Sequence, residues 1–505
     1  MTRERLTLAL LLAFTFAVRA IHPDQPIVEN YVGRQIPTAM VARNLERGSG
    51  FLHPQLDTGP WPNLFLVEPP IYAKLVASTS ALAKLDLEPT GRLVSAAATT
   101  LAAWGLFGLV RRREGLAVAW LALASFGCFP VMIRYGRAFQ PDALMIGFVL
   151  AGLRLWDDFE ATGDRRLAWL GGFVLSTGLA LKLTTAWALL PWLLIVRRWP
   201  INGKLAASAA MLVPAGSWYL WAWQGLAGTG STASMDNAGL WLGALSPGNW
   251  LRFSVWSEVA RGLIGRSFTP IGFVLAGGGL LASGRLDRVW IGWAIGCVVS
   301  IVALAGKWHH AYYWVVVAPL AAVGVGRGLV QLWRWSHCGR IAAGLLGSFF
   351  LLSCGWQSAS TWTTPVEWAD LDVAARTVAS LTTEDEPVIA PEAVLYYAGR
   401  RGYRLEFDPA ATRRAVGEWG VSMEGAGPLN LTESYNMIHT IQTAAIRSSS
   451  YSMHFHITSS NHLLVADVGR EESDAGRRAW RSAIRRRADT RVVVDRPGSM
   501  IAELR

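Results

Sequence analysis

The stretch Arg134-Tyr135-Gly136-Arg137-Ala138-Phe139-Gln140-Pro141-Asp142 separates two long apolar runs, residues 115–133 and 143–156. Charges at the end of a membrane helix are costly unless they are paired, hydrated or used, so Arg134, Arg137 and Asp142 are candidates for function. Two guanidinium groups beside a carboxylate are suited to a phosphorylated substrate. The alternative is a solvated loop, because helix ends at a membrane surface also collect arginine.

Apolar runs like these two recur throughout residues 1–360. The chain has 505 residues, of which 52% are hydrophobic and 16% charged, and this balance is typical of a polytopic membrane protein rather than a soluble enzyme. Since roughly 17–25 apolar residues can cross a bilayer, we predict a mainly α-helical protein with about eleven spans. They lie near residues 5–21, 92–110, 115–133, 139–156, 166–182, 184–197, 205–224, 263–283, 288–305, 310–330 and 341–357.

Two segments have alternative interpretations. Residues 6–18 resemble a cleavable signal, but the many spans that follow favour a retained first helix. The run 70–85 is interrupted by Lys74 and Lys84, so we predict a helix that lies along the membrane surface.

Basic residues alternate with the predicted spans. If the N-terminus lies in the cytoplasm, every cytoplasmic loop is basic, as the positive-inside rule requires; these loops contain Arg111–Arg113, Arg165–Arg166, Arg197–Arg198 with Lys204, Arg285 with Arg288, and Arg334 with Arg340. The layout predicts a multi-pass membrane protein with a cytoplasmic N-terminus. The net charge of +11 is then explained by these loops and by contact with anionic lipid, not by nucleic-acid binding, for which no motif is present.

Residues 364–505 read as a soluble sequence, and the topology places them outside the cytoplasm. Helical and strand-like patterns alternate there, which predicts a small α/β domain. The expected helices are 366–381, 391–399 and 474–488, and the expected strands are 387–390, 404–407, 462–468 and 491–494. The arginine-rich helix 474–488 is interpreted either as a contact for anionic headgroups or as a solvated helix. Residues 411–455 have no assigned structure.

The first outer loop, residues 22–91, is too long for a simple connection and is therefore a candidate for function. It contains the acids Asp24, Asp57 and Glu68. A carboxylate at a membrane surface can deprotonate a hydroxyl acceptor. The alternative for Asp57 and Glu68 is that they cap turns or helices.

A second outer cluster is Lys307-Trp308-His309-His310-Ala311-Tyr312-Tyr313. Adjacent histidines on a helix point in different directions and make a poor metal pair. Lys307, His309, His310, Tyr312 and Tyr313 are better suited to hold a phosphate and a sugar or lipid, although an aromatic belt with a lysine is the alternative. All the candidate clusters fall on one predicted side of the membrane, whereas unrelated interface residues should occur on both.

With these residues in view, the chain resembles the GT-C superfamily of polyprenyl-phosphate-dependent glycosyltransferases. The nearest branch contains the protein O-mannosyltransferases and the lipid A aminoarabinose transferases (glycosyltransferase families 39 and 83). The resemblance covers essentially the whole chain through short motifs, namely Thr38–Leu45, Glu68–Tyr72, Arg134–Asp142, His310–Tyr313 and Tyr396–Tyr403. One departure stands out, because Arg34-Gln35 occupies the position where family members usually carry an Asp-Glu pair.

The resemblance implies transfer of a sugar from a polyprenyl-phosphate donor to a glycan, lipid or protein acceptor at the outer face of a bacterial inner (plasma) membrane, with inversion. Asp57 or Asp24, with Asp142 close by, would act as the base. The departing phosphate would be held by Arg34, Arg134, Arg137 and Lys307, with Gln35 beside them. Glu68 would position a sugar hydroxyl, or ligate a divalent cation if one is used; no other cofactor is expected.

Two alternatives to this function remain. A transporter or flippase of a lipid-linked sugar would favour an internal repeat with paired broken helices near the midplane, and the sequence has no such repeat. A relative that binds the lipid carrier without catalysis is kept open by the missing Asp-Glu pair.

Overall fold

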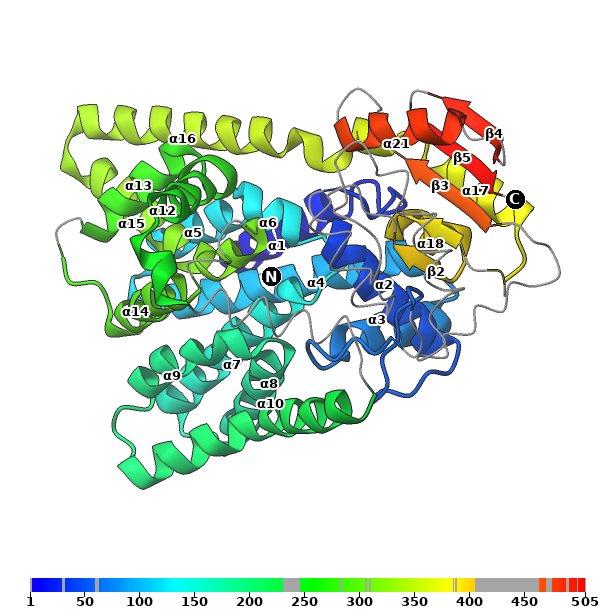
Figure 1. Cartoon of the computed structure of the whole chain (residues 1–505). Coiled ribbons are helices and arrows are strands. Elements are labelled where there is room, and N and C mark those ends of the chain that lie inside the picture. The colour runs from blue at the N-terminus through cyan, green and yellow to red at the C-terminus, as the bar shows by residue number, and fades with distance from the viewer. Residues whose placement is uncertain are drawn as a thin grey trace. The chain divides into compact units, whose positions relative to one another are not determined.

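The computed structural model describes residues 2–504 apart from 30–31, 60–62, 230–245, 282–283, 305–306, 308–309, 385, 387, 405–462, 469–474, 487–489 and 497. The chain divides into two compact units (Figure 1). Unit 1 comprises Met1–Asn30, Leu66–Gly228 and Asp236–Thr363. Unit 2 comprises Tyr31–Phe65, Thr229–Met235 and Thr364–Arg505.

Unit 1 is helical in its described part. Its α-helices are α1 (Arg3–Arg19), α3 (Ile71–Ala83), α4 (Leu87–Arg113), α5 (Leu116–Cys128), α6 (Pro130–Tyr135), α7 (Asp142–Thr162), α8 (Arg165–Leu181), α9 (Leu189–Ile195), α10 (Ile201–Thr229), α12 (Phe253–Ala260), α13 (Pro270–Leu281), α14 (Arg288–Ala303), α15 (Ala318–Trp335) and α16 (His337–Ser358). Short 3₁₀ or π turns are η1 (Leu183–Ala188), η2 (Pro247–Leu251), η3 (Arg261–Ser267), η5 (Ala311–Val316) and η6 (Ala359–Trp362).

Three of the described helices are by themselves long and apolar enough to cross a membrane: Leu87–Arg113, Ile201–Gly225 and His337–Trp368. A fourth span results if Phe253–Ser267 and Pro270–Leu281, bent by 102° at their break, are counted together. The multi-pass character predicted from the sequence agrees with these apolar helices. The count of eleven spans and the orientation of the termini stay predictions.

The predicted span 115–133 is broken in the structure. It is split into α5 and α6 at Phe129-Pro130, because proline cannot donate the backbone hydrogen bond that a continuous helix needs, and Pro130 begins α6. The boundary predicted between the spans 166–182 and 184–197 lies at Lys182, whose extended backbone ends α8 before η1 begins. The helix predicted over 70–85 is α3, and its position along the membrane surface stays a prediction.

α4 and α7 pack closely and run in the same direction. A Cβ on Gly147 would lie 2.6 Å from the carbonyl oxygen of Ala98, and one on Gly105 would lie 2.7 Å from the backbone of Leu150. Glycine at both positions therefore allows the two backbones to approach, as in other membrane helix pairs. The parallel direction follows from contacts at both ends, where Ser95 bonds to Ala138 and Arg113 to Asp157.

Unit 2 contains a five-stranded mixed sheet of order β2-β1-β3-β5-β4 (Figure 1). Its strands are β1 (Val388–Ala390), β2 (Gly402–Arg404), β3 (Leu463–Val468), β4 (Thr490–Arg496) and β5 (Ser499–Leu504). β1 pairs in parallel with β2 and β3, whereas β5 is antiparallel to β3 and β4. Its helices are α2 (Val32–Glu46), α17 (Leu371–Leu381), α18 (Glu392–Ala398) and α21 (Ala475–Arg486), with the turn η7 (Val366–Trp368). The sequence pattern missed β5.

Arginines of α21 form ion pairs with acids of unit 2, which neither sequence interpretation of this helix included. Arg481 is fully buried, and its Nη2 lies 2.9 Å from Asp467 Oδ2. Arg477 also pairs with Asp467, and Arg485 pairs with Asp495. Burial raises the pKa of Asp467, against the lowering effect of the two arginines. Three arginines of the predicted helix 474–488, namely Arg477, Arg481 and Arg485, thus pair with acids of their own unit.

Candidate functional site

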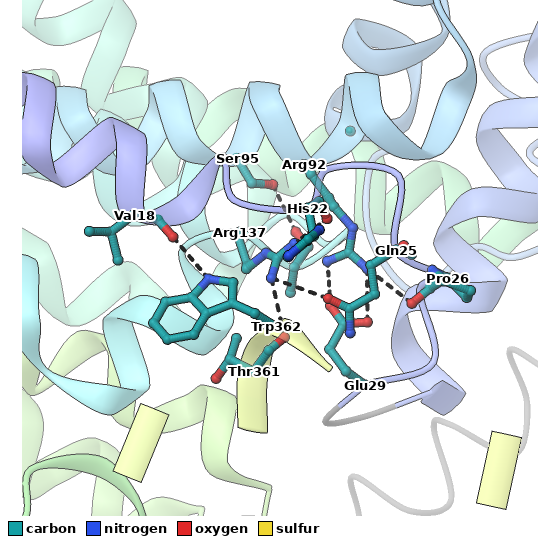
Figure 2. Close-up of polar contacts among 12 residues, drawn as sticks. Val18, His22, Gln25, Pro26, Glu29, Arg92, Ser95, Arg137, Thr361 and Trp362 are labelled. Atoms are coloured by element: carbon teal, nitrogen blue, oxygen red, sulfur yellow. Dashed lines mark hydrogen bonds and ion pairs between the residues drawn. The ribbon is translucent and has the colours of Figure 1, made fainter. Parts of the chain in front are cut away.

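Arg137 is buried and bridges three segments of unit 1 (Figure 2). Its Nη2 donates to the carbonyl oxygen of His22 at 2.7 Å, and its Nη1 donates to that of Thr361 at 3.2 Å. Nη1 also lies 3.4 Å from Gln25 Oε1. The guanidinium group predicted to hold a phosphate is therefore engaged by oxygens of the protein, and Arg137 ties the loop before α7 to the first outer loop and to η6.

A buried ion pair that sequence reasoning missed lies beside Arg137 (Figure 2). Arg92 at the start of α4 pairs through both terminal nitrogens with Glu29, and Nη2 lies 2.8 Å from Oε2. The same nitrogen donates to the carbonyl oxygens of Gln25 and Pro26. Asp24 lies exposed on this segment. This network fixes residues 22–29 against α4.

The loop between α6 and α7 is held by polar side chains of α4. Ser95 Oγ donates to the carbonyl oxygen of Ala138 at 2.8 Å, and Thr99 Oγ1 donates to that of Gly136 at 2.9 Å. The hydroxyl of Tyr72 lies 2.9 Å from Ser95 Oγ, and its ring packs edge-on against Phe139. Because side chains satisfy its carbonyls, this loop keeps one conformation inside an apolar bundle.

Asp142 begins α7 and forms a buried ion pair with Lys182, 40 residues later. Lys182 Nζ lies 2.6 Å from Asp142 Oδ1, and both side chains are almost fully buried. The second oxygen, Asp142 Oδ2, has no hydrogen-bond partner in the described part of the chain. Removing two charges from water is costly, so a pair with one open oxygen is a candidate for substrate contact.

Aromatic rings surround the ammonium group of Lys182. Nζ lies 4.6 Å from the ring centre of Tyr312 and 5.5 Å from that of Tyr313. His310 stacks on Tyr312, with ring centres 5.5 Å apart, and Tyr135 meets the other side of Tyr312 edge-on at 6.1 Å. Tyrosine faces attract a cation. The structure thus joins the predicted His310–Tyr313 segment to Asp142 through Lys182.

The other predicted residues of unit 1 lie in different settings. Arg134 donates to the carbonyl oxygens of Arg266 and Gln357, so it also joins segments of the protein. Lys307 is buried, three residues before His310. Glu68 is buried just before α3. His309 lies outside the described residues.

Asp57, Arg34 and Gln35 belong to unit 2. Asp57 is fully buried; its Oδ2 accepts from Arg43 Nη2 at 2.5 Å and its Oδ1 from Asn44 Nδ2 at 3.2 Å. Both oxygens therefore accept hydrogen bonds from described donors, whereas Asp142 has one oxygen without such a donor. Arg34 is buried with its guanidinium 5.7 Å from the ring centre of Phe65, and Gln35 is buried on α2.

Asp57 also joins the first-loop segment to the rest of unit 2. Its carbonyl oxygen accepts from the backbone of Gly402, and the Gly59 backbone donates back to Gly402. Arg43 donates to the carbonyl oxygen of Tyr396 and lies over the ring of that residue. Two of the sequence motifs, Thr38–Leu45 and Tyr396–Tyr403, thus meet within unit 2.

No group of three or more His, Cys, Asp or Glu side chains suited to a metal ion occurs in the part of the chain that the structure describes. The divalent cation that Glu68 was predicted to ligate stays a prediction.

Lys182 is the main residue that sequence reasoning missed. The signal was present, since it is a single lysine inside the apolar stretch 166–197, and an ionisable residue inside a membrane segment indicates a functional site. Its position was predicted to be the boundary between two spans. Arg92 gave a weaker signal because it begins the predicted span 92–110, where charges are common, and Glu29 gave none, since it lies within the long outer loop 22–91.

Comparison with known proteins identifies the fold. The sequence profile of the dolichyl-phosphate-mannose-protein mannosyltransferase family PMT_2 matches residues 67–221, which include Asp142 and Lys182. No curated protein sequence matches the chain.

Several solved structures are similar over most of the chain. ArnT from Cupriavidus metallidurans bound to undecaprenyl phosphate has a TM-score of 0.60 at 12% identity, covering 99% of this chain and 97% of that one. Oligosaccharyltransferase AglB from Archaeoglobus fulgidus, in complex with an inhibitory peptide and a dolichol-phosphate, has a TM-score of 0.53 at 11% identity, covering 94% and 71%. Arabinofuranosyltransferase AftD from Mycobacteria has a TM-score of 0.52 at 15% identity, covering 100% and 40%. The chain therefore has the GT-C fold, as its motifs predicted.

Proposed function

We propose that this protein is a membrane glycosyltransferase that moves a sugar from a polyprenyl-phosphate donor to an acceptor at the outer face of the membrane. The observation that carries the proposal is the buried Asp142–Lys182 pair within a GT-C fold, with Tyr312 and Tyr313 around the cation. Two similar structures were solved with a polyprenyl phosphate or dolichol phosphate bound, which supports a lipid-linked donor.

In the proposed reaction the acceptor hydroxyl oxygen attacks the anomeric carbon of the donor sugar. The bond from that carbon to the phosphate oxygen breaks, and its electron pair leaves with the phosphate. The proton of the hydroxyl passes to the open oxygen of Asp142. The products are the glycosylated acceptor, inverted at the anomeric carbon, and the polyprenyl phosphate.

Lys182 would balance the charge that develops on the departing phosphate, because a buried cation acts strongly where water is excluded. Lys307, close to the same aromatic segment in sequence, is a second candidate for this role. Arg134 and Arg137 are better described as positioning residues, since their guanidinium groups bond to backbone carbonyls. Asp142 is preferred over Asp57 as the base because one of its oxygens is open.

The test uses purified full-length protein in lipid nanodiscs with radiolabelled polyprenyl-phosphate sugars and a membrane extract as the acceptor source. We expect label to move from at least one donor to an acceptor in the wild type. In Lys182→Met we expect the rate to fall by about 10²–10³-fold, the size seen when one stabiliser of developing charge is removed.

Lys204→Met is the matched control, because Lys204 donates only to the carbonyl oxygen of Arg197 among the contacts described for it. It should keep the wild-type rate. If label moves from none of the donors to an acceptor, while the protein binds the lipid saturably, the carrier-binding alternative would be favoured. Movement of an intact lipid-linked sugar across a sealed vesicle would favour the flippase alternative.

A further inference from the structure

Gln140 lies in the loop before α7, and its side-chain amide has no partner. The residue is fully buried (0% exposed), and neither Nε2 nor Oε1 has a hydrogen-bond partner among the described residues. A buried polar group left unpaired costs about 1–3 kcal/mol. Such groups are rare in native proteins, and the usual reasons are bound water, a ligand or a catalytic role.

The loop around Gln140 is otherwise well satisfied. The backbone N–H of Gln140 donates to Ala138, whose carbonyl also accepts from Ser95. Phe139 packs against Tyr72 and over Gly91, where a Cβ would lie 2.3 Å from its ring. Since both the backbone and the preceding side chain are held, the unpaired amide is a local feature and not a sign of a loosely packed segment.

A second unpaired group lies two residues away. Asp142 Oδ2 is buried without a hydrogen-bond partner in the described chain, while Oδ1 binds Lys182. The two side chains thus leave two acceptor atoms, Gln140 Oε1 and Asp142 Oδ2, and one donor atom, Gln140 Nε2, which carries two N–H groups.

This set of atoms discriminates between ligand chemistries. A phosphate oxygen cannot donate to either acceptor at neutral pH, and the carboxylate repels it. Hydroxyl groups can do both, because each donates one hydrogen bond and accepts others. Sugars carry several hydroxyls close together, whereas the phosphate is better matched by the ammonium of Lys182.

We infer that Gln140 is a specificity-determining residue whose side-chain amide binds a hydroxyl group of the sugar handled at the Asp142–Lys182 site. The inference rests on the proposed function and adds the part of the substrate that this residue reads. The sugar belongs either to the donor or to a sugar-bearing acceptor, and the experiment separates these two sources.

The test variant is Gln140→Leu, which keeps a similar volume and removes the amide. If no protein group pairs with the amide, its removal should leave the thermal unfolding midpoint in lipid nanodiscs unchanged or raised. The value of kcat/KM should fall by about 10–100-fold, because the site would no longer bind the hydroxyl. Monodeoxy sugars provide the specific readout: at one position the wild type should prefer the hydroxylated sugar, and Gln140→Leu should not.

Deoxy donors and deoxy acceptors are compared separately, and the set in which the preference disappears names the source of the hydroxyl. The matched control is Thr99→Val, which removes a hydrogen bond to Gly136 in the same loop. It should lower the unfolding midpoint while keeping the wild-type preference between hydroxylated and deoxy sugars.

A lower unfolding midpoint in Gln140→Leu with an unchanged deoxy preference would mean that the amide is structural, and would overturn the inference. An unchanged midpoint with unchanged kinetics would mean that Gln140 binds water only. If the wild type transfers no sugar, the proposed function fails separately, and binding of polyprenyl phosphate with and without its sugar is measured instead. Equal binding of the two lipids by the wild type would overturn a role of Gln140 in binding the donor sugar, whereas a sugar-dependent preference lost in Gln140→Leu would support it.

Discussion

The two ends of α7 carry carboxylates that differ in how completely they are paired. At the end of α7 near Thr162, Asp157 and Asp158 have arginine partners on both oxygens, as the pairs Arg113–Asp157, Arg112–Asp157, Arg112–Asp158 and Arg154–Asp158 show. At the other end, about 22 Å away at the helical rise per residue, Asp142 binds Lys182 with one oxygen and leaves the other open.

The paired end extends across several helices. Glu114 accepts from Arg327 of α15 and from the backbone of Asp287 before α14, and Arg113 reaches Asp287 at 3.0 Å. These contacts join α4, α7, α14 and α15. The comparison teaches that the number of charges does not identify a site in this protein. Both ends are rich in charge, and Asp157 Oδ2, like Asp142 Oδ2, has no hydrogen-bond partner among the described residues. Asp157 Oδ2 nevertheless lies 3.2 Å from Arg112 Nη1, whereas the described ion pair of Asp142 reaches only Oδ1.

The largest expected effect tests this distinction directly. Asp142→Asn removes the open carboxylate and should lower kcat by about 10²–10⁴-fold, the usual contribution of a general base. Binding of the lipid carrier should persist, because Lys182 remains. Transfer kinetics and equilibrium binding of radiolabelled lipid measure the two quantities. A rate within threefold of the wild type would remove Asp142 from the mechanism and return Asp57 and Asp24 to consideration.

The next effect concerns stability at the same end. Lys182→Met leaves the buried Asp142 carboxylate without a cation and should cost about 3–5 kcal/mol of unfolding free energy. Adding Asp142→Asn should recover more than 1 kcal/mol of that loss, since the unpaired charge disappears. Unfolding of the single and double variants in detergent gives the coupling energy. Strictly additive losses would mean that the two side chains do not interact.

A smaller effect is expected at the paired end. Asp157→Asn should cost about 2–3 kcal/mol of stability, because two arginines, of which Arg112 is partly exposed to solvent, lose a buried partner. After correction for the folded fraction, kcat/KM should remain within about twofold of the wild type, since this end lies far from the proposed chemistry. The same unfolding and transfer assays apply. A loss of transfer without a matching loss of stability would contradict the prediction that this end of α7 takes no part in the reaction.

The smallest effect is the stability contributed by the exposed Arg485–Asp495 ion pair of unit 2. The hydrogen bond from Arg485 lowers the pKa of Asp495, so the ionised form is favoured in the folded state. Its stabilisation is therefore present above the ordinary pKa of Asp, about 3.9, and is lost as the pH falls through the lowered value. Asp495→Asn should cost at most about 1 kcal/mol at pH 7. The difference should shrink as the pH falls towards 3, and a difference that grows there would contradict the assignment.

The resemblance predicted the fold more fully than it predicted the site. The Arg134–Asp142 and His310–Tyr313 motifs lie near one another in unit 1, through Lys182 and the Tyr135–Tyr312 contact. Arg137 was predicted to hold the departing phosphate, and its guanidinium group instead donates to the backbone oxygens of His22 and Thr361. A side chain's type indicates what it can bind, whereas only its neighbours determine what it does bind.

Asp57 illustrates the same limit in unit 2. Its position in a Pro- and Gly-rich stretch was compatible with a base or a turn cap, and neither pattern includes the Arg43 and Asn44 contacts that the structure gives it. Those partners lie 14 and 13 residues earlier on a helix, at a separation where sequence periodicity carries no information about contact.

The sequence by itself determined the helical membrane character of the chain and the charged loop before α7, because apolar length and the placement of charges along a helix are local properties. The tertiary structure alone decided that Lys182 faces Asp142, that Arg92 neutralises Glu29, and that the Gln140 amide and one oxygen of Asp142 have no hydrogen-bond partner among the described residues. The physical reason is that burial makes every polar group depend on a partner, and packing, not sequence separation, chooses that partner.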